Sequence, residues 1–195
     1  MRAAAHEVRS AHADRHSVGL GRLGRGEGDG ELGDDAAVVV GLVHVFDRGV
    51  VMGAVNQGDG DDIFVMNDGT INGAVDQGAG ADRAEINGGS ITGNIQQGGG
   101  IDDFRMTGGE AGSLNQGDAL DTFFMSGGRI VDFFDDGDYA VMTGGRIGRV
   151  NMKLDNNVFD MSGGEIDKNL VTGFGNDTII ISNGTIRGNI SVTGR

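Results

Sequence analysis

A repeat with a period near 20 residues constrains this chain more than any other feature of its sequence. The copies align on a two-residue turn signal, and successive signals lie 20, 20, 19, 17, 19 and 20 residues apart. The seven signals are Asp68-Gly69, Gly88-Gly89, Gly108-Gly109, Gly127-Gly128, Gly144-Gly145, Gly163-Gly164 and Asn183-Gly184. A degenerate eighth copy keeps Phe46, Gly49, Val51 and Val55, so the periodic region begins near Val43. A fixed period of this length indicates a solenoid, in which each copy buries its apolar residues only by stacking on its neighbours.

Apolar residues recur at four fixed places in each copy. Two residues before the turn signal stands Met66, Ile86, Met106, Met125, Met142, Met161 or Ile181. Two residues further back stands Phe64, Ala84, Phe104, Phe123, Ala140, Phe159 or Ile179. After the signal come Ile71, Ile91, Ala111, Ile130, Ile147, Ile166 and Ile186, followed by Val75, Ile95, Leu114, Phe134, Val150, Leu170 and Ile190. The Phe-x-Met alternation places both side chains on one face of a strand, and the Gly and Asx residues suit tight corners.

We therefore predict an all-β fold, a parallel β-solenoid of the right-handed β-helix type with about eight coils of about 20 residues. Each coil is expected to hold three short strands separated by two tight corners and one longer Gly-rich corner. Coils stacked roughly 4.8 Å apart give a rod of about 40 Å. The solenoid domain spans residues 43–195. Residues 1–42 are rich in Arg, Ala and Gly without an amphipathic period, and we expect an irregular or disordered segment there.

Composition agrees with a thin, stacked structure. Glycine supplies 39 of the 195 residues, proline is absent, and only 37% of the residues are hydrophobic. The absence of cysteine excludes a disulfide framework and a thiolate metal site. The formal net charge of -14 disfavours nucleic acid as a partner, because neutralising phosphates requires Lys and Arg, and it suits cation binding.

Two further columns are interpreted as structural. Methionine recurs at a core position, where its flexible side chain fills an irregular, narrow interior. Glutamine recurs in four successive copies, which predicts an amide ladder between coils. The members of this column are Gln57, Gln77, Gln97 and Gln116.

An acidic column is the candidate functional site. Four residues before the Met or Ile position stands Asp62, Asp82, Asp102, Asp121, Asp138, Asn157 or Asp177. Segments such as "QGDGDDIFV" and "TGFGNDTII" contain G-x-G-x-D and resemble the calcium-binding nonapeptide of RTX proteins, in which Gly-rich corners and Asp side chains hold Ca²⁺. The resemblance implies calcium ligands at Asp62, Asp82, Asp102 and Asp177, and at Asp121 in a weaker copy.

The sequence leaves two interpretations of this column open. Carboxylates stacked at the coil spacing repel by about 1 kcal/mol per neighbouring pair in water, and a hard divalent cation would relieve that repulsion. Alternatively, each Asp accepts hydrogen bonds from the backbone of its own corner and points at water. The motif occurs once per coil here, whereas RTX repeats follow one another directly, so half of the RTX ligand positions are missing.

Over residues 43–195, copies such as "DTFFMSGGRI" and "NVFDMSGGEI" resemble the Gly-rich β-helical passenger regions of bacterial autotransporters. The resemblance implies a structural or adhesive stalk, secreted or exposed on a Gram-negative cell surface, that binds a host or cell-surface ligand. It also implies a β-barrel translocator encoded beyond this chain. The N-terminus has no apolar segment of a signal peptide, and the chain stops in mid-coil. We therefore expect a fragment, whose open ends favour end-to-end self-association.

Two alternative functions are weighed against the stalk. The first is a calcium-binding, RTX-like module of a secreted protein. The second is a polysaccharide-acting β-helix enzyme, because charged residues gather where the repeat shortens to 17 residues. The residues of this cluster are Arg129, Arg146, Arg149, Asp132, Asp135 and Asp136. A deletion at a corner explains the irregular coil equally well, and we expect no catalytic activity.

Overall fold

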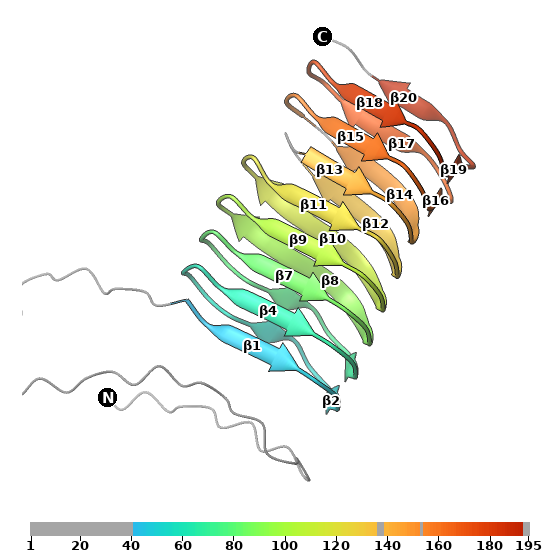
Figure 1. The fold of residues 1–195 in the computed structure, drawn as a ribbon. Coiled ribbons are helices and arrows are strands. Elements are labelled where there is room, and N and C mark those ends of the chain that lie inside the picture. The colour runs from blue at the N-terminus through green and yellow to red at the C-terminus, as the bar shows by residue number, and fades with distance from the viewer. Residues whose placement is uncertain (1–40, 136–138, 153, 193–195) are drawn as a thin grey trace, which may run out of the picture. The chain divides into compact units, whose positions relative to one another are not determined.

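The computed structural model describes residues 41–135, 139–152 and 154–192. These residues fold as a parallel β-solenoid, with its coils stacked one on the next from β1 to β20 (Figure 1). The predicted fold class is thereby confirmed. The described residues form no helix, and no membrane-crossing helix is found among them. The predicted irregular segment, residues 1–42, lies outside the described residues except for its last two positions.

One side of the solenoid is an eight-stranded sheet, here called sheet A, to which each coil contributes one strand of four residues. In spatial order its strands are β1 (Val43–Phe46), β4 (Ile63–Met66), β7 (Arg83–Ile86), β9 (Asp103–Met106), β11 (Thr122–Met125), β13 (Tyr139–Met142), β15 (Val158–Met161) and β18 (Thr178–Ile181). Equivalent residues of successive copies lie side by side, as in the register of Phe64 with Ala84 and of Met66 with Ile86. The degenerate first copy joins in the same register, with Val43 beside Ile63.

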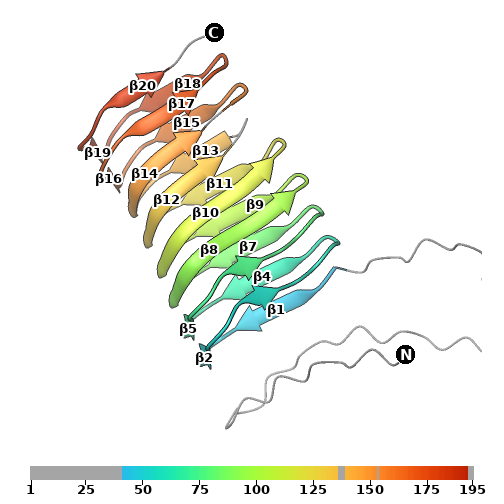
Figure 2. The same ribbon diagram turned by 180° about the vertical axis from the view of Figure 1, so that it is seen from behind.

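The other side is a twelve-stranded sheet, here called sheet B. It faces the viewer in Figure 2, which shows the molecule from behind. Its strands are β2 (Val50–Val51), β3 (Val55–Asn56), β5 (Thr70–Ile71), β6 (Val75–Asp76), β8 (Ser90–Gly99), β10 (Glu110–Asp118), β12 (Arg129–Asp135), β14 (Arg146–Met152), β16 (Glu165–Ile166), β17 (Leu170–Gly173), β19 (Thr185–Ile186) and β20 (Ile190–Val192).

The prediction of three short strands per coil is correct only near the ends of the solenoid. In β8, β10, β12 and β14 the two short strands of sheet B merge into one longer strand. β8 pairs with both β5 and β6, and the Gly93 N–H donates to the Gly73 carbonyl at 3.1 Å. The backbone ladder therefore continues across the bend, and no separate corner is needed there.

The core is a narrow column of apolar side chains between the two sheets. Phe64, Met66, Phe104 and Met106 are fully buried, and Ile71 opposite them in sheet B is also fully buried. The alternation predicted for Phe-x-Met is confirmed, because residues 64 and 66 face the core while residues 63 and 65 face outward. Each coil thus hides its apolar residues only with the help of the coils above and below it.

The prediction for the last apolar column is wrong in one coil, where Phe133 takes the place assigned to Phe134. Phe133 is fully buried and lies in register with Leu114 and Val150. Its ring stacks on that of Phe123, with centroids 4.3 Å apart. Leu114 and Val150 both follow the preceding core residue of sheet B by three positions, and β12 adopts the spacing of these two neighbours.

Candidate functional site

The acidic column lies at the edge of sheet A where the Gly-rich corner ends. Asp62, Asp82, Asp102 and Asp121 each stand directly before a strand of this sheet and are 1%, 2%, 1% and 1% exposed. Asn157 takes the same place before β15 and is fully buried, while Asp177 before β18 is half-buried. The fold therefore brings the sequence-predicted residues together in one column. Asp138 lies outside the described residues.

Backbone hydrogen bonds between coils hold one oxygen of each carboxylate. The Asp62 N–H donates to Oδ1 of Asp82 at 2.8 Å, and the Asp82 N–H donates to Oδ1 of Asp102 at 2.8 Å. The Asp102 N–H donates in turn to Oδ1 of Asp121 at 2.7 Å. The hypothesis of an Asp that points at water and binds its own corner is therefore wrong for these residues, because each carboxylate is buried and binds the preceding coil.

The second carboxylate oxygen is buried without a hydrogen-bond donor at two of these positions. Oδ2 of Asp62 and Oδ2 of Asp82 have no partner among the described residues. At the equivalent place in another coil, Nδ2 of Asn157 donates to the carbonyl oxygens of Leu154 at 3.0 Å and Thr172 at 3.2 Å and to Oδ1 of Asp177 at 3.0 Å. An ionised Asp has only acceptor oxygens to offer, so it would conflict with acceptors arranged as they are around Asn157. A proton or a cation at this point would remove the conflict.

Electrostatics at Asp82 agree with this geometry. Burial, together with the smaller effect of the charges of Asp62 and Asp61, raises the pKa of the Asp82 carboxyl to about 6. The hydrogen bond from the Asp62 N–H acts in the opposite direction and lowers this pKa. The carboxyl is therefore ready to take up a proton in mildly acidic solution, where an exposed Asp stays ionised.

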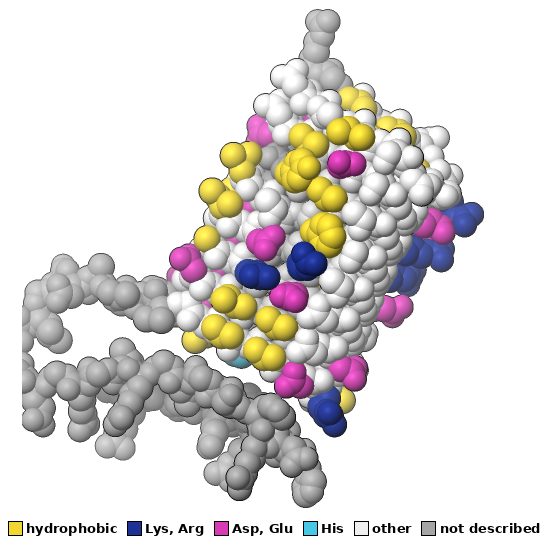
Figure 3. All heavy atoms as spheres, viewed as in Figure 1, with side chains coloured by type: hydrophobic (Ala, Val, Ile, Leu, Met, Phe, Trp, Pro, Cys, Tyr) yellow, Lys and Arg dark blue, Asp and Glu magenta, His cyan; other side chains and the backbone are white. Residues whose placement is uncertain are grey.

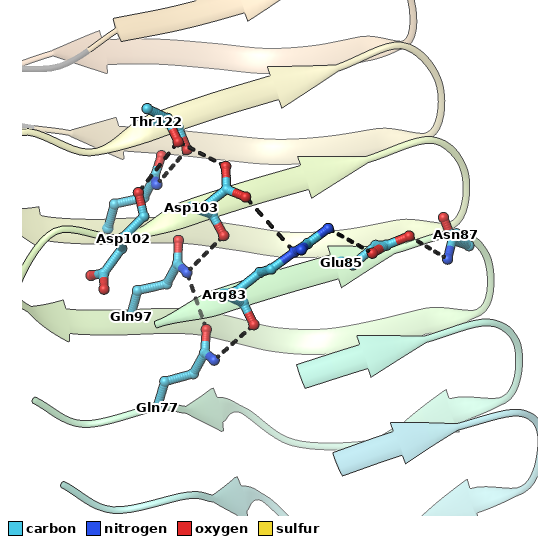
Figure 4. A network of polar contacts seen from close by, with 9 residues as sticks. Gln77, Arg83, Glu85, Asn87, Gln97, Asp102, Asp103 and Thr122 are labelled. Carbon is cyan, nitrogen blue, oxygen red and sulfur yellow. Dashed lines mark hydrogen bonds and ion pairs between the residues drawn. The ribbon is translucent and has the colours of Figure 1, made fainter. Parts of the chain in front are cut away.

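A glutamine column lies beside the acidic one (Figure 4). Nε2 of Gln97 donates to Oε1 of Gln77 at 3.1 Å, which confirms the predicted amide ladder for this pair. Each glutamine also donates to the backbone carbonyl six residues later in its own coil, at 3.2 Å for Gln77 and Arg83. This contact was not predicted, although the constant spacing of five residues between Gln and Asp is a signal for it. The amide bond fixes the corner that carries the aspartate.

No group of three or more His, Cys, Asp or Glu side chains that could hold a metal ion occurs in the part of the chain that the structure describes. A cation in the acidic column would therefore have to take most of its ligands from backbone carbonyl oxygens. Calcium accepts such ligands and requires six to eight oxygens. Calcium binding at the five predicted aspartates stays a prediction.

The second predicted cluster forms exposed ion pairs on sheet B. Arg149 pairs with Asp132 at 3.1 Å, and Arg146 pairs with Asp167 at 2.7 Å. Asp167 was not predicted as a partner, and Arg146 holds the pKa of its carboxyl below the ordinary value. The side chain of Asp135 and all of Asp136 lie outside the described residues.

A shallow hollow lies over β8, β10 and β12. The charged residues that line it are Glu110 and Arg129. Glycoside hydrolysis generally uses a pair of carboxylates that flank the scissile bond. The hollow presents one carboxylate and one guanidinium, so it gives the enzyme alternative no specific support. The expectation that the chain has no catalytic activity stays a prediction.

Comparison of the chain with protein-family models, with curated proteins and with solved structures gave no significant match.

Proposed function

We propose that this chain is the β-solenoid stalk region of a surface-exposed or secreted protein, similar in role to the passenger regions of autotransporters. One observation carries the proposal: the core columns and the backbone ladder of sheet A continue through all eight strands, from β1 to β18. Each added coil lengthens such a stack by about 4.8 Å without enlarging its core. This construction suits a spacer that holds a binding region at a distance from a cell.

Hydrogen bonds on the outer surface also favour a stiff spacer. Asn67 donates to Asp47 at 2.9 Å, Asn87 donates to Asn67 at 3.0 Å, and the Thr107 hydroxyl donates to Asn87 at 2.8 Å. These exposed side chains link four successive coils along the stacking direction. Bending the solenoid would have to break this row as well as the backbone ladders.

Protease treatment of intact cells of the source organism tests the exposure of the chain. With an antibody against the solenoid, we expect the signal to disappear from intact cells while a cytoplasmic marker stays intact. A signal that is lost only after the cells are lysed would overturn the proposal. Beads coated with the full chain then test the adhesive role, with beads coated with an unrelated acidic protein as the control. Equal retention of both kinds of bead on host cells would overturn adhesion but not the stalk.

The second candidate function is calcium binding, which the buried Oδ2 atoms of Asp62 and Asp82 favour. If calcium binds only the folded chain, a concentration of 100 times the dissociation constant stabilises it by about 2.7 kcal/mol. We expect thermal melting near pH 7 to shift upward with CaCl₂ and back with EGTA, and the Asp62→Asn/Asp82→Asn variant to lose the shift. MgCl₂ is the control. A melting temperature that responds to neither calcium nor chelator would remove this candidate.

A further inference from the structure

The outer face of sheet A carries three zones along the stack (Figure 3). Hydrophobic side chains gather at two places on this face, and charged side chains separate them. The first apolar zone consists of Val43, Val45, Ile63 and Val65 on β1 and β4, of which Val45 is 56% exposed. The second zone includes Phe124 on β11 and both Tyr139 and Val141 on β13. Tyr139 is 49% exposed, although soluble monomers seldom leave contiguous apolar patches open to water.

The charged zone between them alternates in sign in both directions. Arg83 and Glu85 lie on β7, and their register neighbours on β9 are Asp103 and Arg105. Arg83 lies 3.3 Å from Glu85 and 3.8 Å from Asp103 (Figure 4). Arg105 turns toward the second apolar zone, with its guanidinium carbon 4.7 Å from the centre of the Phe124 ring. The four charges form a square with like signs on the diagonals.

Such a square of charges is complementary to the same square on a second copy of the chain that is related to the first by a two-fold rotation. Consider a two-fold axis parallel to the strands, between β7 and β9, with the outer faces of two copies of sheet A in contact. Arg83 of one copy then faces Asp103 of the other, and Glu85 faces Arg105. The same axis brings β4 opposite β11 and β1 opposite β13, so that Val65 faces Phe124 and Val45 faces Val141. In the other row Val43 faces Tyr139 and Ile63 faces Thr122. Three of these four pairs are apolar, Thr122 presents a methyl group beside its hydroxyl, and each charge meets one of opposite sign.

We propose that the outer face of sheet A is a homodimer interface, in which a second copy of this chain packs face to face about this two-fold axis. An isologous contact requires a self-complementary patch, and this face is one. Strands of the two sheets then run in nearly the same direction, as in aligned sheet packing. Asp160 on β15 stays outside the paired strands, so its carboxylate is not buried.

The size of the face sets the strength of the dimer. The six paired strands of four residues cover about 29 Å by about 13 Å at ordinary strand dimensions. This footprint of about 380 Å² per copy is smaller than the roughly 800 Å² per partner of a stable specific interface, so the dimer is weak, transient and dependent on concentration. Opposite charges at its centre set the orientation of the two copies more than they add affinity.

Sedimentation velocity of the full chain, from about 1 μM to about 1 mM, tests the proposal. We expect the mass to rise from that of a 20.1 kDa monomer toward twice that value. Arg83→Glu and Asp103→Arg each place like charges across the interface, and each variant alone is expected to dimerise at least tenfold more weakly. Arg129→Glu makes the same change of charge on sheet B and serves as the matched control, with no expected effect.

Mixing the two interface variants makes the test specific to this axis. In a heterodimer of Arg83→Glu with Asp103→Arg, opposite charges face each other again at both positions, so the mixture should dimerise like the wild type. Failure of the mixture to recover would overturn the proposed pairing. Circular dichroism of each variant shows that it is folded before its mass is compared.

Tyr139 supplies a readout on the unmodified protein, since it is the single tyrosine of a chain without tryptophan. Its fluorescence should become less accessible to iodide over the same range of concentration in which the mass doubles. A monomer at every concentration would overturn the proposal, including the case in which residues 1–40 of the same chain cover this face. A dimer that tolerates both charge reversals would also overturn it, because another surface would then hold the copies together.

Discussion

At the scale of single residues, the methionine side chain of one coil packs against the corner glycine of the next coil and leaves no room there for a Cβ atom. Gly128 has a φ of +82°, and a Cβ at this position would lie 2.7 Å from Cε of Met106. Gly164 and Met142 repeat the arrangement, with a corresponding distance of 2.6 Å. The glycine is therefore required both by its backbone conformation and by the side chain beneath it. This contact explains why Met and Gly recur together in the sequence.

Replacing Gly128 with alanine should destabilise the solenoid by about 2 kcal/mol or more, because the left-handed conformation and the contact with Met106 both oppose a Cβ. Urea denaturation followed by circular dichroism measures the change. Gly99→Ala is the matched control, since a Cβ there meets no atom within 4 Å. The control should stay within about 0.5 kcal/mol of the wild type. Equal effects of the two changes would contradict this explanation.

Asp82 makes the stability of the fold depend on pH. Its pKa is about 6 in the folded chain and 3.8 ordinarily, so the folded state holds more protons between these values. The contribution of Asp82 to the free energy of unfolding is therefore highest below pH 4. This contribution falls by about 3 kcal/mol at most as the pH rises to about 6, and it stays level above that pH.

Asp82→Asn should remove this dependence, since an amide stays neutral and Asn157 already occupies the same column. The variant should gain stability relative to the wild type as the pH rises from 4 to 7, measured by urea denaturation at each pH. Asp82→Ala is the control, because it also removes the acceptor for the Asp62 N–H and should be less stable throughout. A constant difference between wild type and Asp82→Asn would contradict the prediction.

At the scale of the strands, stacked aromatic rings fill part of the core. The ring of Phe123 lies between those of Phe104 and Phe133, with centroid separations of 5.6 Å and 4.3 Å. The next coil has only Ala140 at the position of Phe123. The large side chain of Phe133 on β12 thus adds volume to the core next to a coil in which the small side chain of Ala140 occupies the Phe position. The choice of Phe133 over Phe134 follows from this packing as well as from the register with β10 and β14.

Phe123→Ala should lower the free energy of unfolding by about 3 to 5 kcal/mol, because it leaves a cavity between two stacked rings. Phe124→Ala, one residue later on the outer face of the same strand, is the matched control and should cost about 1 kcal/mol. Chemical denaturation at low protein concentration gives both values. Comparable losses would show that β11 does not alternate between core and surface in the way described.

At the scale of the whole solenoid, stability comes from contacts between neighbouring coils. The described coils in the middle have a neighbour on each side, and Met161 in the core column is fully buried, whereas Ile181 at the same position of β18 is 43% exposed. A stack of this kind loses its outer coils more readily than its inner ones.

Native-state hydrogen exchange should therefore show the slowest amides in β9 and β11 and faster exchange toward β1 and β18. Mass spectrometry of peptides from each coil resolves this gradient. Equal protection in every coil would contradict it and would indicate that the stack opens as a single cooperative unit.

Much of the fold could be predicted because its determinants are local. Alternation in Phe-x-Met sets the buried face of each strand, glycine marks the corners, and the constant period brings equivalent residues into register. The positions of the aspartates and glutamines followed from the same alignment. The partners of their polar atoms did not, since Oδ1 of Asp82 is held by an N–H that belongs to a different coil.

The sequence by itself thus determined the solenoid, its period and the columns that line it, because each depends on residues close together in the chain. Only the tertiary structure decided that the aspartates are buried, that Phe133 enters the core and that the strands of sheet B merge. It also decided that charges of alternating sign meet on the outer face of sheet A. These features depend on what the coils above and below present to each residue, and packing between coils cannot be read from one copy of the repeat.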